Sequence, residues 1–276
     1  MADRVWLITG ASRGFGAEIS KAVLAAGDRL VATARDVTSL NYLGKDKKLF
    51  TAPLDVTDES GVSETVHGAL GHFGHIDVLV NNAGISLLGA VEESSGADVE
   101  RLYRTNVFGL LNVTRAVLPG MRARRSGHII NMSSVAGYSA YEGFGVYSST
   151  KFAVEGLTEA LHRELAPLGI RVTVIEPGFF RTDILDSSKS LLETSQQIAD
   201  YADTAGAMRD AVPGYNHNQP GDPAKLARAV LEIVNAPEPP LRLPLGPDTL
   251  ARIGEKNALI EKETSAWRAL AASTDF

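Results

Sequence analysis

The stretch Thr9-Gly10-Ala11-Ser12-Arg13-Gly14-Phe15-Gly16 separates an apolar run at residues 5–8 from a segment with helical periodicity. Glycines here permit a tight turn and a close approach of the backbone to a ligand. The N-terminus of the following helix offers unpaired N–H groups to a pyrophosphate. A glycine-rich turn alone is weak evidence, because it can be merely a turn. Its place after the first strand of an alternating chain indicates nucleotide binding.

Short β-rich runs alternate with longer helical segments as far as about residue 180. The strands are expected at residues 5–9, 30–34, 48–54, 76–81, 128–132 and 171–176, and the helices at residues 14–26, 58–73, 97–121 and 145–168. This alternation predicts a mostly parallel sheet with helices on both faces, which is the doubly wound α/β fold. A seventh strand is expected at the sheet edge, at residues 241–245, where proline is tolerated.

The 276 residues fit a single domain (1–276) with a C-terminal elaboration. Residues 183–221 are polar and irregular and are expected to form a lid beside the substrate, with a loop at residues 213–221. A helix should begin after Asp222, with Asp222 as N-cap and Pro223 in the first turn. Residues 248–272 carry apolar side chains at roughly helical spacing, and we expect a helical extension packed on the body or on a neighbouring subunit.

Composition excludes several classes of function. The net charge of -6 argues against nucleic-acid or anionic-membrane partners, and the absence of cysteine excludes disulfides and thiolate catalysis. No metal site is expected. The first apolar run is too short for a signal-peptide core, and no stretch reaches the length of a membrane span. We therefore expect a soluble, cytoplasmic protein.

A phenol and an ammonium stand four residues apart at Tyr147 and Lys151. On a helix they share one face, about 6 Å apart along the axis. Lys151 is then expected to lower the pKa of Tyr147 from its free value of about 10, which would make the phenol a usable acid and base near neutral pH. Taken alone, such a pair is usually an ordinary pair on a helix surface.

The chain resembles the short-chain dehydrogenase/reductase family, on motifs that span residues 5–182 in the right order and spacing. The matching motifs are the glycine-rich turn, Asn81-Asn82-Ala83-Gly84, Thr105-Asn106-Val107, Ser134, the Tyr147/Lys151 pair and Pro177-Gly178. The resemblance is nearer to the branch of 17β-hydroxysteroid- and retinol-dehydrogenase-like enzymes. It implies a Rossmann fold with a seven-stranded sheet and an NADP-dependent carbonyl reductase or alcohol dehydrogenase.

The family's functional residues carry over to matching positions. Tyr147 would exchange a proton with the substrate oxygen, Ser134 would hydrogen-bond that oxygen, and Lys151 would bind the nicotinamide ribose. Asn106 would help to hold a water that links Lys151 to solvent. The resemblance places the remaining cofactor contacts at Gly10, Ser12, Arg13, Gly14, Phe15, Gly16, Arg35, Asp55, Val56, Asn82, Ala83, Gly84, Pro177, Gly178 and Thr182, beside Tyr147 and Lys151.

Charge near the second strand favours NADP(H) over NAD(H). An NAD-binding protein of this fold usually has an acid after that strand, and Ala34 stands there instead, followed by Arg35. Arg13 lies in the glycine-rich turn, and two guanidiniums suit a 2′-phosphate. Asp36 leaves the NAD alternative open, since a shift of the strand end would bring it to the acid's place. Asp55 has the further interpretation of a helix cap.

The substrate is expected to be a mainly apolar small-molecule ketone or alcohol. The loops after Gly84, Ser134 and Gly178 carry aromatic side chains, which can either line a cleft or pack the loops themselves. Substrate contacts are expected at Ser134, Tyr141, Phe144, Tyr147 and Phe179, with Tyr138 and Phe180 as further wall residues.

The C-terminal sequence bears on assembly. The last strand lacks the paired glycines of many tetrameric members of the family, so a homodimer through the helices that contain Asn106 and Tyr147 is expected, with a tetramer as the alternative. A non-catalytic NADPH-binding regulator on the same fold is the alternative to an enzyme.

Overall fold

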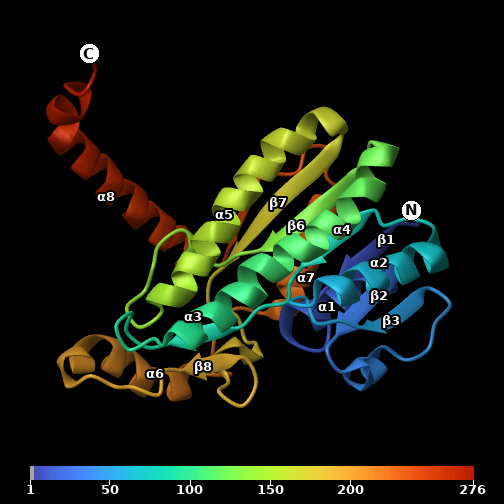
Figure 1. Cartoon of the computed structure of the whole chain (residues 1–276), viewed down its shortest axis with the longest axis horizontal. Helices are drawn as coiled ribbons and strands as arrows, with labels where there is room; N and C mark the ends of the chain where they lie inside the picture. Colours follow the sequence, from blue (N-terminus) through green and yellow to red (C-terminus); the bar gives the residue numbers. More distant parts are fainter. Residues whose placement is uncertain (1–2) are drawn as a thin grey trace.

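The structure, a computed structural model, describes residues 3–276 and contains a seven-stranded sheet in the order β3-β2-β1-β4-β6-β7-β9 (Figure 1). All six pairings within it are parallel. The strands are β1 (Val5–Ile8), β2 (Arg29–Ala34), β3 (Leu49–Pro53), β4 (Val78–Asn81), β6 (Gly127–Met132), β7 (Ile170–Pro177) and β9 (Arg242–Leu245). The predicted doubly wound fold is confirmed, including the proline-containing edge strand β9.

Helices cover both faces of the sheet because successive side chains of each strand point to opposite faces. Trp6 and Ile8 of β1 pack with α1 (Gly14–Ala25) and α7 (Pro223–Asn235). Val5 and Leu7 pack with α2 (Glu59–Phe73) and α4 (Gly109–Arg124). As predicted, Asp222 caps α7 by accepting a hydrogen bond from the backbone N–H of Ala224 at 2.8 Å.

The segment expected to form one helix at residues 97–121 is divided in the structure. It consists of α3 (Gly96–Tyr103), a π-helical turn η2 (Arg104–Phe108) and α4. The backbone N–H of Gly109 donates to the carbonyl of Arg104, five residues earlier. Such π-turns occur frequently at functional sites, and this one contains Asn106. Helix α5 (Gly145–Leu165) carries Tyr147 and Lys151 on adjacent turns.

The region between β7 and α7 is more ordered than its polar sequence predicts. It contains β8 (Leu191–Glu193), which pairs with β5 (Ser86–Leu88) in a separate two-stranded sheet, and helix α6 (Ala207–Tyr215). The expectation of a loop at residues 213–221 is therefore wrong in its first three residues, because α6 continues through Pro213. In Figure 1 these elements lie beyond the carboxyl ends of the strands.

The C-terminal extension is the helix α8 (Pro247–Ala272), and it projects from the body (Figure 1). Only Thr249 is buried, and every residue from 257 onward is exposed. The expected packing on the body therefore holds for the first turns of α8 alone. No helix among residues 3–276 combines the length and apolar character needed to cross a membrane.

Candidate active site

A single cavity of about 700 Å³ runs along the carboxyl ends of the strands, from the glycine-rich turn to the lid. Strand order reverses between β1 and β4, which is where ligands bind in open α/β sheets. Apart from Gly16, Asn106 and Tyr138, all the predicted cofactor, catalytic and substrate residues line this cavity. The folded chain thus brings together residues separated by more than 160 positions in sequence.

The glycine-rich turn fits a bound pyrophosphate. Gly10 and Gly14 have φ of 66° and 54°, a backbone region that favours glycine. A Cβ on Gly16 would lie 2.3 Å from the carbonyl oxygen of Gly10, so Gly16 acts through packing. The N-cap of α1, Arg13, makes no side-chain cap, and the first turn of α1 contains no acid. The positive end of the helix is therefore left for an anion.

Asn82 holds the glycine-rich turn against the end of β4. Its side-chain amide donates to the carbonyl oxygens of Thr9 and Gly10 at 2.9 and 3.0 Å. The hydroxyl of Thr9 in turn accepts from the backbone N–H groups of Asn82 and Ala83, both at 3.0 Å. Asn82 thus shapes the nucleotide end of the cavity as well as lining it.

An arginine and an aspartate follow the end of β2, and they lie in different surroundings. The strand ends at Ala34, and the exposed Arg35 lines the cavity. Asp36 instead caps the 3₁₀ helix η1 (Val37–Leu43), where its Oδ1 accepts from the Thr38 hydroxyl at 2.7 Å and from the Thr38 backbone N–H at 2.9 Å. These hydrogen bonds lower the pKa of Asp36. Similarly, Asp55 accepts from Thr57 while it lines the cavity.

Arg13 is turned toward the segment that follows β7. Its guanidinium donates to the carbonyl oxygen of Lys189 at 3.2 Å and to the hydroxyl of Ser190 at 2.9 Å, and it lies 3.9 Å from Asp183. Of the two arginines expected at a 2′-phosphate, only Arg35 is therefore without a polar partner among the described residues.

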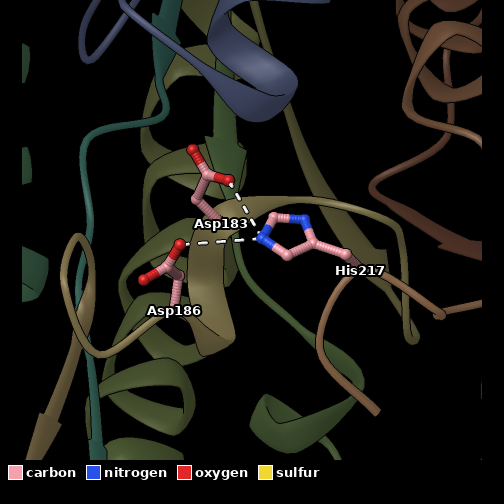
Figure 2. Close-up of side chains that lie close together, drawn as sticks. All are labelled: Asp183, Asp186 and His217. Atoms are coloured by element: carbon pink, nitrogen blue, oxygen red, sulfur yellow. Dashed lines mark ion pairs between the residues drawn. The ribbon is translucent and has the colours of Figure 1, made fainter. Parts of the chain in front are cut away.

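An acidic pair and a histidine stand beside this contact (Figure 2). His217 Nε2 lies between the carboxylates, 3.8 Å from Asp183 and 3.6 Å from Asp186. The three ligand atoms are within 4.8 Å of one another, a spacing that a cation would also satisfy. Asp183 already lies 3.4 Å from the Lys189 ammonium and 3.9 Å from the Arg13 guanidinium. We interpret the cluster as ion pairs that fasten residues 183–190 to the glycine-rich turn.

Three of the four side chains predicted to be catalytic lie together along the cavity. Lys151 Nζ donates to the carbonyl oxygen of Met132 at 2.9 Å and lies 5.8 Å from the ring centroid of Tyr147. Ser134 caps a short 3₁₀ turn, its hydroxyl accepting from the backbone N–H of Ala136 at 3.1 Å. Tyr147, Lys151 and Ser134 all line the cavity, so the phenol can reach an oxygen that the serine also contacts.

The expected lowering of the Tyr147 pKa is not found. Burial raises the pKa of Tyr147 to about 12, and the nearby Ser134 hydroxyl only partly opposes the rise. Burial also lowers the pKa of Lys151 to about 8, while Glu155 opposes that change. Desolvation outweighs the attraction between the two groups. Tyr147 is therefore protonated at neutral pH, which is the state that a proton donor in carbonyl reduction needs.

Asn106 is almost fully buried and is held by its neighbours. Its side-chain amide donates to the carbonyl of Ile85 at 2.9 Å and to the Thr150 hydroxyl at 3.1 Å, and its oxygen accepts from the Ile85 backbone at 3.0 Å. These contacts tie the π-turn to the loop after Gly84 and to α5. The side chain does not line the cavity, so any contact with a water near Lys151 remains a proposal.

Aromatic and aliphatic side chains form the substrate end of the cavity. Phe179 packs edge-on against Tyr141 and Tyr215, with ring centroids 5.8 and 5.1 Å apart. Phe144 packs against Tyr147 at 6.2 Å. Tyr138 is not in this wall, because its hydroxyl contacts Asn257 of α8. The expected lid also lines the cavity, but the sequence did not single out its apolar contact residues, which are Ile184, Leu185, Leu192 and Met208.

Comparison with known proteins agrees with the fold. The model of the short chain dehydrogenase family matches residues 4–192. The oxidoreductase BOA17 of Botryotinia fuckeliana is 38% identical over 98% of this chain and 99% of its own. The 3-ketodihydrosphingosine reductase of Bacteroides thetaiotaomicron is 37% identical over 90% of this chain and 89% of its own. Retinol dehydrogenase 8 of Bos taurus is 34% identical over 87% of this chain and 81% of its own.

Solved structures show the same architecture. A short-chain dehydrogenase from Streptomyces avermitilis superposes with a TM-score of 0.92, at 40% identity and with both chains covered completely. A family member from Burkholderia phymatum in complex with NAD superposes with a TM-score of 0.82. Its sequence is 26% identical, and the match covers 95% of this chain and 97% of that one. Serine dehydrogenase complexed with NADP+ superposes with a TM-score of 0.76 at 32% identity, and the match covers 89% of this chain and 95% of that one. Both nucleotides therefore occur among structural relatives.

Proposed function

The chain belongs to the short-chain dehydrogenase family, and on that premise we propose that it is an NADP(H)-dependent oxidoreductase acting on a mainly apolar carbonyl or secondary alcohol. The observation that carries the reaction type is the convergence of Ser134, Tyr147 and Lys151 on one cavity with the glycine-rich turn. The bound nicotinamide would supply or accept the hydride. The protonated Tyr147 would donate its proton to the carbonyl oxygen in reduction, and Ser134 would hold that oxygen in place.

The apolar walls support the proposed substrate class. Phe144, Phe179, Ile184, Leu192 and Met208 present hydrocarbon surface to the end of the cavity beside Tyr147. The relatives named for 3-ketodihydrosphingosine and retinol also take their names from molecules with long hydrocarbon parts. Incubation of the protein with NADPH and a panel of ketones, followed at the nicotinamide absorbance band, tests the proposal. Tight NADPH binding without oxidation by any carbonyl would favour a regulator.

Arg35 supports the proposed preference for NADP(H), and its charge gives a direct test. We expect Arg35→Asp to lower the ratio of kcat/KM for NADPH over NADH by about a hundredfold, because a hydrogen-bonded charge pair is worth about 1.5–3 kcal/mol and the new carboxylate repels phosphate. Steady-state kinetics with both nucleotides measure the ratio. Lys47→Asp makes the same change of charge on an exposed residue outside the cavity and should leave the ratio unaltered. An unaltered ratio in Arg35→Asp would remove Arg35 from the 2′-phosphate site.

We further propose a homodimer through the surface that contains Phe108 and Phe152. These side chains are 51% and 45% exposed, on the π-turn before α4 and on α5 respectively, which is the surface expected from sequence. Large exposed aromatic residues are favoured at interfaces. Phe108→Asp combined with Phe152→Asp should convert a dimer into a monomer in light scattering. Val91→Asp alters another exposed apolar residue and is the control. A dimer that persists in the double variant would exclude this surface.

A further inference from the structure

A group of charged residues lies behind the catalytic side chains, on the body side of Lys151. Glu155 follows Lys151 by one turn of α5, and Glu176 stands near the end of β7. Arg242 of β9 contacts Glu155, Glu176 at 3.1 Å and Glu159 at 3.2 Å. Glu155 and Glu176 are only 6% and 1% exposed. The mechanism above uses none of these carboxylates.

Charge within this group is unbalanced without Lys151. Three carboxylates meet the single guanidinium of Arg242, and water cannot solvate the two buried ones. Lys151 lies one turn before Glu155 on α5 and is itself buried, and the negative charge of Glu155 raises the pKa of Lys151. A buried charge is tolerated only when it is paired or neutralised. The ionisation of Glu155 is therefore linked to the charge of Lys151.

Two buried polar atoms also belong to this region, one of them in the Glu155 carboxylate itself. Glu155 Oε1 and the hydroxyl of Ser133 are both buried, and neither has a well-formed hydrogen bond among the described residues, although the Ser133 hydroxyl is near enough to Glu155 to lower the pKa of that carboxyl. Ser133 directly follows β6 and precedes Ser134, and a Cβ on Gly137 would lie 2.5 Å from the Ser133 hydroxyl and 3.0 Å from the Lys151 carbonyl. Four elements therefore place polar or charged groups around Glu155. They are α5 with Lys151 and Glu159, β7 with Glu176, β9 with Arg242, and the end of β6 with Ser133.

We propose that Glu155 is a positioning residue whose ionised carboxylate keeps Lys151 in its ammonium form. The proposal rests on the function proposed above, because it concerns how that catalytic lysine keeps its charge. When Glu155 is protonated, Lys151 loses this support and burial favours the neutral amine. Glu155 acts on the reaction only through Lys151 and does not contact the substrate.

The pKa shifts of the two groups are consistent with this linkage. Burial raises the pKa of Glu155 to about 7, with Glu176 adding to the rise while Ser133 and Arg242 oppose it. Burial lowers the pKa of Lys151 to about 8, and Glu155 opposes that fall. Glu155 therefore becomes charged at a lower pH than that at which Lys151 loses its proton.

The test compares Glu155→Gln with the wild type in the reduction of 9,10-phenanthrenequinone by NADPH, between about pH 6 and pH 9. We expect equal kcat near pH 6, where Glu155 is protonated, and about tenfold lower kcat near pH 8, which corresponds to one pKa unit at Lys151. Glu164→Gln, at an exposed position on the same helix, should follow the wild type throughout. If kcat of Glu155→Gln is lower than that of the wild type by the same factor at every pH, the role of Glu155 is merely structural and the proposal is overturned. The proposal is also overturned if the pH profile of Glu155→Gln equals that of the wild type.

A second measurement does not depend on turnover. NADPH affinity, followed by nicotinamide fluorescence, should be severalfold weaker in Glu155→Gln near pH 8 and unaltered near pH 6, and the difference should vanish in a Lys151→Met background. If the wild type reduces no carbonyl but the binding curves diverge, the proposed function fails and the role of Glu155 stands. Parallel binding curves overturn the role of Glu155, whatever the turnover.

A further variant covers the case in which Glu155→Gln does not fold. Glu176→Gln keeps Glu155 and removes a neighbouring negative charge that raises its pKa. Glu155 then stays ionised near pH 8, so the kcat and NADPH affinity of Glu176→Gln at that pH should equal those of the wild type. A tenfold loss of kcat near pH 8 in Glu176→Gln would show that the Glu155 carboxylate does not sustain Lys151, and it overturns the proposal.

Discussion

Replacement of Tyr147 by Phe is expected to abolish carbonyl reduction while leaving NADPH binding intact. The variant removes only the hydroxyl, and a positioned proton donor contributes about 10²–10⁴-fold to a rate. Tyr147 is protonated at neutral pH because burial raises its pKa to about 12, so the wild type has a proton to donate throughout the working range. We therefore expect kcat to fall by about a thousandfold or more, measured by nicotinamide absorbance with a ketone substrate.

Two comparisons make this result specific. NADPH affinity should change little in Tyr147→Phe, because the ring and its packing against Phe144 remain. Phe152→Tyr places a phenol on the exposed side of the same helix and should neither impair the wild type nor rescue Tyr147→Phe. Turnover retained within tenfold in Tyr147→Phe would contradict the assignment of the proton donor.

The elements that carry the site were predictable because each rests on a local sequence pattern. The apolar strand at residues 5–8, the glycines after it and the helix that follows specify one β-turn-α unit. The central strands β4 and β6 are buried along almost their whole length, as in a parallel sheet covered on both faces. The Tyr147/Lys151 spacing places both side chains on adjacent turns of α5, and the predicted cavity residues then follow from the topology.

The electrostatics of the site were not predictable, because they depend on burial and on contacts distant in sequence. The expectation for Tyr147 considered only the charge of Lys151, whereas desolvation dominates in the folded chain. Likewise, the contacts of Arg13 with Lys189 and Ser190 join segments far apart in the sequence, and no local pattern indicates them. The π-turn at Asn106 has no simple periodic signal, since it interrupts an otherwise continuous helical pattern.

The lid was the least predictable part, since one long-range ion pair organises it. Glu93 and Arg209 are separated by 116 residues, and the carboxylate accepts two hydrogen bonds from the guanidinium, at 2.6 and 3.1 Å. It also accepts from the backbone N–H groups of Ala90 and Ile198, both at 2.8 Å. The side chain of Glu93 is completely buried and that of Arg209 is 11% exposed. Both Glu93 and Arg209 are surrounded by other polar residues in the sequence, so no local pattern predicts that they are buried and paired.

Loss of the carboxylate at Glu93 is therefore expected to be among the most destabilising single changes in this chain. Glu93→Ala leaves the buried Arg209 guanidinium and two backbone N–H groups without their acceptor, and breaking a buried pair typically costs about 3–5 kcal/mol. Chemical denaturation should show a loss of about this size in the free energy of unfolding. Because Met208 of the same helix lines the cavity, KM for an apolar ketone should also rise by about tenfold, with a smaller change in kcat.

The dependence of this loss on pH separates the ion pair from mere packing. The hydrogen bonds from Arg209 lower the pKa of Glu93 to about 2, below its ordinary value of 4.5. A lowered pKa stabilises the folded state above pH 4.5, and that contribution disappears as the pH falls toward 2. The difference in unfolding free energy between the wild type and Glu93→Ala should therefore narrow over this range. Glu64→Ala removes an exposed carboxylate of α2 and should show neither the loss of unfolding free energy nor its narrowing with pH. A difference that is constant with pH would mean that the ionised carboxylate does not hold the lid.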